Sequence, residues 1–294
     1  MTKPFTSVRA LTLSKLLTLV VGLPTSAWAL HGGAPVRSGE HSQVLRMVFL
    51  RDGERKICSG TRVGPRHVLT AAHCFGDIKR LTGWQCLPLG LNIEFANSRQ
   101  PMVDGRGLPS GTPLAVEGVH IHPDVANTGT QFDRQPFERR LDLAIVELAR
   151  DLPANFPTGS VHYGAVANGT AALMGGWGLL GHGREARNTL QLQLANTRVH
   201  GTGAKKFHVG TDALYLVHGD SGGPVLRASD GAVLGVNSSA KPSAWATIPQ
   251  GTRDVTVVTG YDSMATPMAG MGSWVSGVVR GNPRPECIPT GGRR

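Results

Sequence analysis

Residues 219–224, Gly-Asp-Ser-Gly-Gly-Pro, place a serine between glycines. A glycine at Gly219 can take backbone angles closed to other residues, and it leaves its N–H uncovered. The backbone N–H groups of Gly219 and Ser221 could therefore point at one position and stabilise an oxyanion there. A glycine-rich turn whose serine only hydrogen-bonds its own backbone is the alternative. Because serine alone is a poor nucleophile, the stretch indicates catalysis only if the chain also supplies a base and a group that orients the base.

His73 is the candidate base. Residues 58–63 and 68–74 predict two strands joined by a Gly-Pro turn, and His73 lies in the second of them. A disulfide from Cys58 to Cys74 would hold this hairpin together, fix the backbone beside His73 and contribute about 3 kcal/mol in the chain-entropy model. A histidine that is simply satisfied within the core is the alternative. This alternative is the less favoured of the two, because His73 would lie beside a disulfide and inside a run of small residues.

Asp142 is the candidate orienting group. Residues 141–148, Leu-Asp-Leu-Ala-Ile-Val-Glu-Leu, predict a strand with Glu147 at an exposed position. Asp142 stands among apolar residues at the start of this strand, where a buried carboxylate is costly unless it is paired. Holding the Nδ1–H of a catalytic histidine would satisfy the carboxylate and fix the tautomer of the ring. An aspartate at the strand end that faces water is the alternative.

The order of the three residues separates the classes of serine hydrolase. Residues 219–223 also fit the Gly-x-Ser-x-Gly pattern of α/β-hydrolases, but those enzymes need a histidine after the serine, and the last histidine here is His218. The subtilisin order needs an acid before the histidine, and Asp52, in a turn, is the only aspartate before His73. Histidine, aspartate and then serine is the chymotrypsin order, which the chain follows.

Three motifs resemble those of the trypsin/chymotrypsin-like serine proteases: Thr-Ala-Ala-His-Cys at 70–74, Asp-Leu-Ala-Ile at 142–145 and the stretch at 219–224. Residues 30–33, Leu-His-Gly-Gly, are similar to that family's mature start, and residues 273–275 to the start of its C-terminal helix. The resemblance implies an all-β fold of two antiparallel six-stranded β-barrels, with the triad between them and a short C-terminal helix.

The resemblance also implies a division of the chain and roles for its residues. A signal peptide at 1–29 would precede an N-terminal barrel at 30–155 and a C-terminal barrel with a tail at 156–294. In this arrangement Ser221 is the nucleophile, His73 the base and Asp142 its orienting group, and the N–H groups of Gly219 and Ser221 form the oxyanion hole. The freed ammonium of Leu30 would pair with Asp220 and so activate the enzyme.

The expected specificity pocket departs from the family. Tyr215 stands where the residue at the base of the pocket is usually found, which is aspartate in trypsins, so selection of Lys or Arg by that position is not supported. Val217 replaces a cysteine that family members usually have four residues before the nucleophile. Ser238, Asp262 and Ser263 complete the predicted lining of the pocket. We expect cleavage after small or medium uncharged residues.

The first 29 residues predict a signal peptide. A basic segment is followed by an apolar stretch at 16–23 that is too short to span a bilayer, and Ala-Trp-Ala at 27–29 fits a cleavage site. We therefore expect a mature chain that begins at Leu30, is secreted or periplasmic and has no membrane partner.

The charge of the mature chain is moderately basic. Three basic residues precede residue 30, so 27 Lys and Arg remain against 20 Asp and Glu. The excess is dispersed, with short clusters only at 139–140, 205–206 and 293–294, which predicts a solvated basic surface. Because we find no basic patch interleaved with aromatic residues and no nucleic-acid motif, we expect no nucleic-acid partner.

Four cysteines in an exported chain predict two disulfides, with three connectivities possible in principle. Cys86, in an irregular insertion at 76–118, and Cys287, in the C-terminal tail, would form the second pair by elimination. No pair of cysteines has zinc-site spacing, and His120 and His122 have no evident third ligand. We expect neither a metal nor a cofactor.

The sequence thus predicts a secreted serine endopeptidase that acts through an acyl-enzyme intermediate, with proteins or peptides as substrates and proteinaceous inhibitors as partners. Two other functions stay open. One is a binding protein on a protease fold that has lost activity, which the altered pocket would allow. The other is an esterase that uses the same triad.

Overall fold

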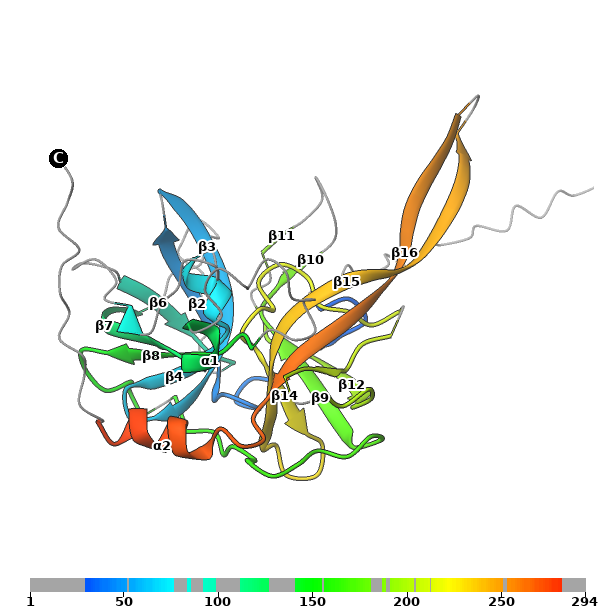
Figure 1. The fold of residues 1–294 in the computed structure, drawn as a ribbon. Coiled ribbons are helices and arrows are strands. Elements are labelled where there is room, and N and C mark those ends of the chain that lie inside the picture. The colour runs from blue at the N-terminus through cyan, green and yellow to red at the C-terminus, as the bar shows by residue number, and fades with distance from the viewer. Residues whose placement is uncertain are drawn as a thin grey trace, which may run out of the picture.

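Strands make up most of the regular structure. The computed structural model describes residues 30–51, 53–76, 84–85, 92–98, 112–126, 141–154, 156–180, 187–188, 191–203, 205–211, 213–250 and 253–281. Within these residues the strands form two seven-stranded antiparallel sheets and a two-stranded ribbon (Figure 1). Two short α-helices and one 3-10 helix accompany them.

The elements of the first sheet and the short helices beside it are β2 (Val44–Arg51), β3 (Glu54–Gly64), β4 (His67–Thr70), η1 (Ala72–Phe75), β5 (Trp84–Gln85), β6 (Asn92–Ala96), β7 (Thr112–Ile121), α1 (Pro123–Ala126) and β8 (Ala144–Leu148). The elements of the second sheet, with the ribbon and the last helix, are β1 (Ala34–Pro35), β9 (Ala171–Gly176), β10 (Leu179–Leu180), β11 (Arg187–Asn188), β12 (Gln193–Arg198), β13 (Phe207–His208), β14 (Pro224–Arg227), β15 (Val233–Gln250), β16 (Arg253–Pro267) and α2 (Gly272–Val279).

The first sheet closes on itself. Its order is β5-β7-β6-β2-β3-β4-β8, and β7 also pairs with β8, so six strands form a closed barrel with β5 outside it. Apolar side chains are buried along its strands, among them Val68, Leu69 and Ile145, which are almost fully buried. The register places Thr70 opposite Ala144. The segment that leaves β4 and the segment that enters β8 therefore meet at the same end of the barrel.

The second sheet has the order β1-β12-β9-β14-β15-β16-β13. His200, just after β12, exchanges two backbone hydrogen bonds of 2.9 and 2.8 Å with His208 of β13. The last strand of this order is therefore connected back to the end of β12. Met174, Phe207 and Val225 are buried inside it. The predicted all-β, chymotrypsin-like double-barrel fold is confirmed. The boundary between residues 155 and 156 stays a prediction.

One hairpin extends far beyond the second sheet. β15 and β16 stay paired from Gly235 opposite Pro267 to Gln250 opposite Arg253, and their far end projects away from both sheets (Figure 1). At its near end the same hairpin carries Ser238 on β15 and Thr266 on β16, whose hydroxyl groups belong to the site described below.

The helix α2 lies against the first barrel, although it follows the second sheet in the chain (Figure 1). Val275 and Val278 are buried in the same apolar cluster as the barrel strands, and the ring of Trp274 meets that of His122 edge-on at 4.8 Å. The predicted C-terminal helix is thus confirmed. No helix in the described part of the chain is long and apolar enough to cross a membrane.

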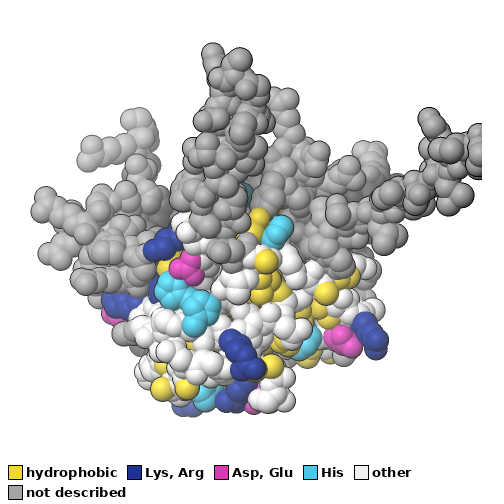
Figure 2. All heavy atoms as spheres, turned by 90° about the vertical axis from the view of Figure 1, so that its right-hand side faces the viewer, with side chains coloured by type: hydrophobic (Ala, Val, Ile, Leu, Met, Phe, Trp, Pro, Cys, Tyr) yellow, Lys and Arg dark blue, Asp and Glu magenta, His cyan; other side chains and the backbone are white. Residues whose placement is uncertain are grey.

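Charged side chains are spread over the surface. On the face seen from the right of Figure 1, Lys and Arg lie scattered among Asp, Glu and His side chains (Figure 2). This distribution fits the dispersed basic excess that the sequence predicts, for the described residues of that face.

Three predictions of local structure were wrong. The insertion expected to be irregular over 76–118 contains β5, β6 and the first part of β7, which pair within the first sheet. The strand expected over 68–74 ends at Thr70, and the residues after it turn into the 3-10 helix η1. Glu147 is 2 % exposed instead of facing water, because β8 is covered by its neighbours. Its carboxylate is satisfied by Arg66 (2.7 Å) and by His120 Nε2 (2.8 Å), which allows burial.

Candidate active site

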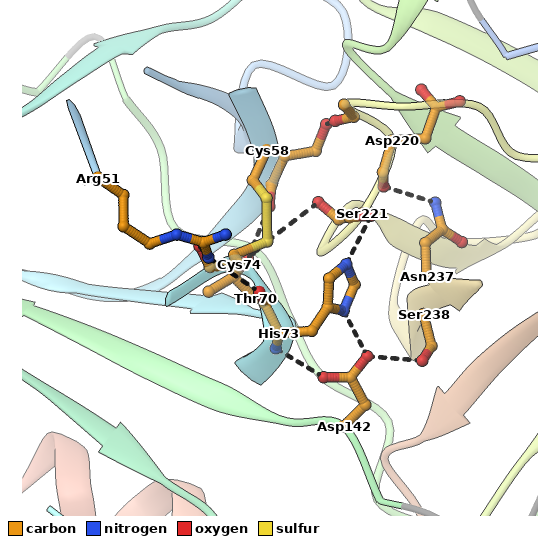
Figure 3. Close-up of a disulfide and its surroundings, with 12 residues drawn as sticks. Arg51, Cys58, Thr70, His73, Cys74, Asp142, Asp220, Ser221, Asn237 and Ser238 are labelled. Atoms are coloured by element: carbon orange, nitrogen blue, oxygen red, sulfur yellow. Dashed lines mark hydrogen bonds and ion pairs between the residues drawn. A yellow bond between two sulfur atoms is a disulfide. The ribbon is translucent and has the colours of Figure 1, made fainter. Parts of the chain in front are cut away.

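A disulfide fixes the turn that carries His73. Cys58 of β3 and Cys74 of η1 are bonded, as expected, with their Cα atoms 6.4 Å apart (Figure 3). The guanidinium of Arg51 also stabilises this turn, because its Nη1 donates hydrogen bonds to the carbonyl oxygens of His73 (3.3 Å) and Cys74 (2.8 Å). The turn is therefore attached to both β2 and β3.

The loop that carries Ser221 packs tightly against the first barrel. The backbone carbonyl oxygen of Ser221 accepts a hydrogen bond from the backbone N–H of Ser59 at 2.8 Å. Gly222 has φ +81°, and a Cβ built there would lie 2.0 Å from Thr70 Oγ1 and 2.3 Å from the carbonyl oxygen of Ser59. Only glycine fits this position, for its backbone angles and for the space available.

The three candidate residues lie in one line of hydrogen bonds (Figure 3). Ser221 Oγ is 2.9 Å from His73 Nε2, and His73 Nδ1 is 2.7 Å from Asp142 Oδ2. Since an ionised carboxylate only accepts, Nδ1 carries the proton and Nε2 of the neutral ring is left to accept the Ser221 hydroxyl. This is the tautomer that a general base next to serine requires.

The charges in this line shift the pKa values of its members. Burial alone would raise the pKa of Asp142, but His73, the nearby Lys206 and the hydroxyl of Ser238 together hold it well below its usual value. Burial lowers the pKa of His73, and the Asp142 carboxylate overcomes this, so the net pKa of His73 is raised. The carboxylate stays ionised and the ring is a stronger base than a free histidine.

Two further polar residues stand behind Asp142. Ser238 Oγ donates to Asp142 Oδ2 at 2.6 Å, and Lys206 Nζ donates to Ser238 Oγ, also at 2.6 Å. The sequence placed Ser238 in the specificity pocket and Lys206 in a solvated basic cluster. Lys206 is instead 3 % exposed, so that interpretation was wrong for it. Its place just before a short apolar strand, Phe207–His208, is the only sequence signal of burial.

A pocket of about 520 Å³ opens beside Ser221. Gly219, the proposed oxyanion donor, lines it and has φ +97°, which favours glycine. The described residues that line the pocket with Ser221 and Gly219 are Arg51, Arg55, Lys56, Ile57, Cys58, His73, Cys74, Leu179 and His218. The wall is therefore formed by the first barrel, by Leu179 of the ribbon strand β10 and by the loop that carries Ser221.

Leu30 and Asp220 lie together. Leu30 is fully buried, and its backbone N–H is one of three that hydrogen-bond the Asp220 carboxylate. The other two come from Gly178 (2.8 Å) and Val217 (2.9 Å). Burial raises the pKa of Asp220 to about 7, against the lowering effect of these N–H groups. The nitrogen atom of Leu30 is thus already at the carboxylate with which its ammonium is predicted to pair.

The remaining predicted pocket residues are engaged with other groups. Tyr215 is buried between the rings of His31 (4.3 Å) and Tyr261 (4.5 Å). Ser263 Oγ accepts the backbone N–H of Leu216 at 2.9 Å. Asp262 Oδ2 is 2.6 Å from His208 Nδ1. None of these three side chains is among the described residues that line the pocket beside Ser221.

Other predicted features concern metals and the second disulfide. Cys86 and Cys287 lie outside the described residues. In the part of the chain that the structure describes, no group of three or more His, Cys, Asp and Glu could hold a metal ion. His120 pairs with Glu147, and His122 packs on Trp274.

Comparison with known proteins agrees with this fold. A family model described as Trypsin matches residues 31–260. Kallikrein 1-related peptidase b27 of Mus musculus is 27 % identical over 261 residues, which cover 79 % of this chain and 88 % of the mouse protein. Kallikrein 1-related peptidase b24 of the same species is 26 % identical over 293 residues, covering 90 % and 99 %. The cercarial protease of Schistosoma mansoni is 28 % identical over 239 residues, covering 72 % and 80 %.

The family match covers more than half of the chain, and the chain belongs to the trypsin family of serine proteases.

Proposed function

We propose that this protein is a secreted serine endopeptidase that hydrolyses peptide bonds in proteins or peptides. The unbroken line of hydrogen bonds from Ser221 through His73 to Asp142 carries the proposal. Each group has the donor or acceptor role that acyl transfer needs, at distances between 2.7 and 2.9 Å.

The reaction follows from this geometry in two halves. Ser221 Oγ attacks the carbonyl carbon while His73 Nε2 takes the hydroxyl proton, which gives a tetrahedral intermediate. The C–N bond then breaks as Nε2 returns the proton to the leaving amine, and an ester to Ser221 remains. Water attacks this ester by the same proton transfers and releases the acid. Asp142 stays ionised throughout and stabilises the imidazolium.

The backbone N–H groups of Gly219 and Ser221 are the proposed donors to the developing oxyanion. Removing one such donor from a serine protease typically costs a factor of about 10²–10³ in kcat. Gly219 is held in place because its carbonyl oxygen accepts the hydroxyl of Ser59 at 2.8 Å.

Activation follows removal of the predicted signal peptide after residue 29. The new ammonium of Leu30 would replace its amide N–H beside the Asp220 carboxylate. The buried carboxylate of Asp220 would then be paired with a positively charged group. A buried charge without such a partner costs several kcal/mol. Because Asp220 adjoins Gly219, the pair would also hold the oxyanion donor.

We propose selection of small or medium uncharged residues before the scissile bond. Tyr215 stands at the position expected to form the base of the pocket, and it offers only a phenolic hydroxyl. Asp262, the carboxylate that would favour Lys or Arg, is already paired with His208. Strong cleavage after Arg that disappears in Asp262→Ala would show this specificity to be wrong.

A fluorophosphonate probe followed by peptide-library profiling tests the function. We expect the secreted protein to be labelled on Ser221, Ser221→Ala to be unlabelled, and peptides to be cleaved at internal bonds. Hydrolysis of esters without peptides would identify an esterase. Absence of labelling in a correctly processed, folded protein would identify a binding protein on a protease fold.

A further inference from the structure

Lys206 is a buried lysine behind the candidate triad. It lies directly before β13 and is 3 % exposed. Its ammonium donates to Ser238 Oγ at 2.6 Å and to Thr266 Oγ1 at 3.0 Å. Lysine is almost never buried to this extent unless its charge is compensated. These two hydroxyl groups accept hydrogen bonds from the ammonium but carry no charge, so the compensating negative charge must come from a carboxylate.

Asp142 supplies that charge through one intervening hydroxyl. An ammonium group can only donate, so Ser238 Oγ accepts from Lys206. The single proton of Ser238 is then left for Asp142 Oδ2, at 2.6 Å. The charge on Lys206 therefore sets the direction of the whole chain of hydrogen bonds, from the ammonium through Ser238 to the carboxylate. A neutral amine could accept the Ser238 proton instead and release Asp142.

We propose that Lys206 is a positioning residue of the triad, which directs the Ser238 hydroxyl to Asp142 and opposes protonation of His73 through its charge. The inference rests on the proposed peptidase function and deepens it. The consequence is a histidine that stays neutral, and able to accept the Ser221 proton, at a lower pH than it would beside Asp142 alone.

The charges around His73 determine the sign of this effect. Asp142 raises the pKa of His73, while Lys206 and Arg51 lower it. Burial lowers the pKa of Lys206 itself to about 8, and Asp142 opposes that change. Lys206 thus keeps its charge over the pH range in which a histidine titrates.

The neighbouring strands carry other charged groups, and these do not substitute for Lys206. β13 and β16 contribute His208 and Asp262, which pair with each other at 2.6 Å. β15 contributes Lys241, which is exposed. Removing Lys206 therefore removes the buried cation that the hydroxyl of Ser238 connects to Asp142.

The first test needs no turnover. The His73 ring is titrated by NMR in a Ser221→Ala background, with and without Lys206→Met. We expect Lys206→Met to raise the pKa of His73 by about one, because it removes a unit charge that three successive hydrogen bonds of 2.6, 2.6 and 2.7 Å link to the ring. Lys205→Met is the matched control, since Lys205 is a partly exposed neighbour paired with Asp124 at 3.9 Å. An unchanged pKa in folded Lys206→Met would overturn the proposal.

The second test is the pH profile of kcat/KM on a peptide that the wild type cleaves. The apparent pKa of the acid limb should rise by a similar amount in Lys206→Met and stay unchanged in Lys206→Arg. This expectation does not depend on the change in maximal rate. If Lys206→Met does not fold, Lys206→Gln keeps a donor to the hydroxyls without the charge and should show the same rise. A rate loss with no movement of the acid limb would reduce Lys206 to a packing residue and contradict the proposal.

The two tests separate this inference from the proposed function. A wild type that cleaves no peptide, together with a raised pKa of His73 in the titration, would reject the peptidase and retain the role of Lys206. Peptide cleavage with no shift of the pKa would do the reverse.

Discussion

The carboxylate of Asp142 holds His73 at two points. Oδ1 accepts the backbone N–H of His73 at 3.0 Å, and Oδ2 accepts the ring Nδ1–H at 2.7 Å. One side chain therefore fixes both the backbone of η1 and the rotation of the ring. An amide in its place has a single acceptor oxygen, so it could not accept both protons.

Asp142→Asn should therefore lower kcat by about 10⁴ while the fold is kept, because the proton moves to Nε2 and the acceptor for the Ser221 hydroxyl is lost. Steady-state kinetics on a cleaved peptide measure the loss. Asp124→Asn removes an exposed carboxylate and is the control, with little change expected. A loss of less than tenfold in Asp142→Asn would exclude Asp142 as the orienting group.

Ser221→Ala and His73→Ala should each remove most of the turnover, by about 10⁴–10⁶ in kcat. The proton transfer needs both groups, so the double variant should be little worse than either single one. Single-turnover kinetics on all three variants would show this. Losses that add in free energy would contradict a triad that acts as a unit.

Gly222→Ala should destabilise the folded protein by about 3 kcal/mol or more, because the new Cβ collides with Thr70 and the positive φ is strained. Gly231→Ala has a similar φ of +72° with nothing within 4 Å of the new Cβ, so it should lose only about 1 kcal/mol. Urea unfolding measures both free energies. Equal losses would mean that the serine loop does not sit against β4 as described.

Activity should fall at alkaline pH as the ammonium of Leu30 loses its proton. A free α-amino group has a pKa of roughly 8, and the proposed pairing with Asp220 would raise the pKa in the folded state above that. The pair is therefore complete at lower pH and is lost as the pH rises through the raised pKa. The alkaline limb of kcat/KM measures this effect.

A form with one extra residue before Leu30 checks the same pair. It cannot place an ammonium at Asp220 and should be nearly inactive at all pH values. Full activity of this form, or a mature start well downstream of Leu30 in the secreted protein, would rule out activation by the pair.

Much of the fold and site could be predicted because the informative residues lie in short local motifs. The order of His73, Asp142 and Ser221 along the chain identifies the class of hydrolase, and the spacing of Cys58 and Cys74 suits a hairpin. Asp142 stood out because a carboxylate among apolar residues needs a partner. The structure brings these residues together as expected.

The other site features depend on contacts between distant parts of the chain. Lys206 adjoins the partly exposed Lys205 in sequence. The burial of Lys206 follows from the pairing of β13 with β16 and from its contacts with Ser238 and Thr266. Glu147 stands at a position of the predicted strand that was expected to face water. In the structure all residues of β8 are buried, and the Glu147 carboxylate pairs with Arg66 and His120. Ser238 lies at the base of the long hairpin. The sequence predicts that it lines the specificity pocket, but it does not predict its hydrogen bonds to Asp142 and Lys206.

The burial of Leu30 beside Asp220 has a consequence for the predicted removal of residues 1–29. A processing enzyme must bind several residues on both sides of the bond that it cuts. The side chain of Leu30 has no exposed surface, so the folded chain does not offer it for binding. The predicted cut before Leu30 must therefore come while this part of the chain is still unfolded. Cleavage and folding then compete in time, and a chain that folds first would keep its leader and remain inactive. Slow maturation would appear as a trapped precursor rather than as a misfolded protein.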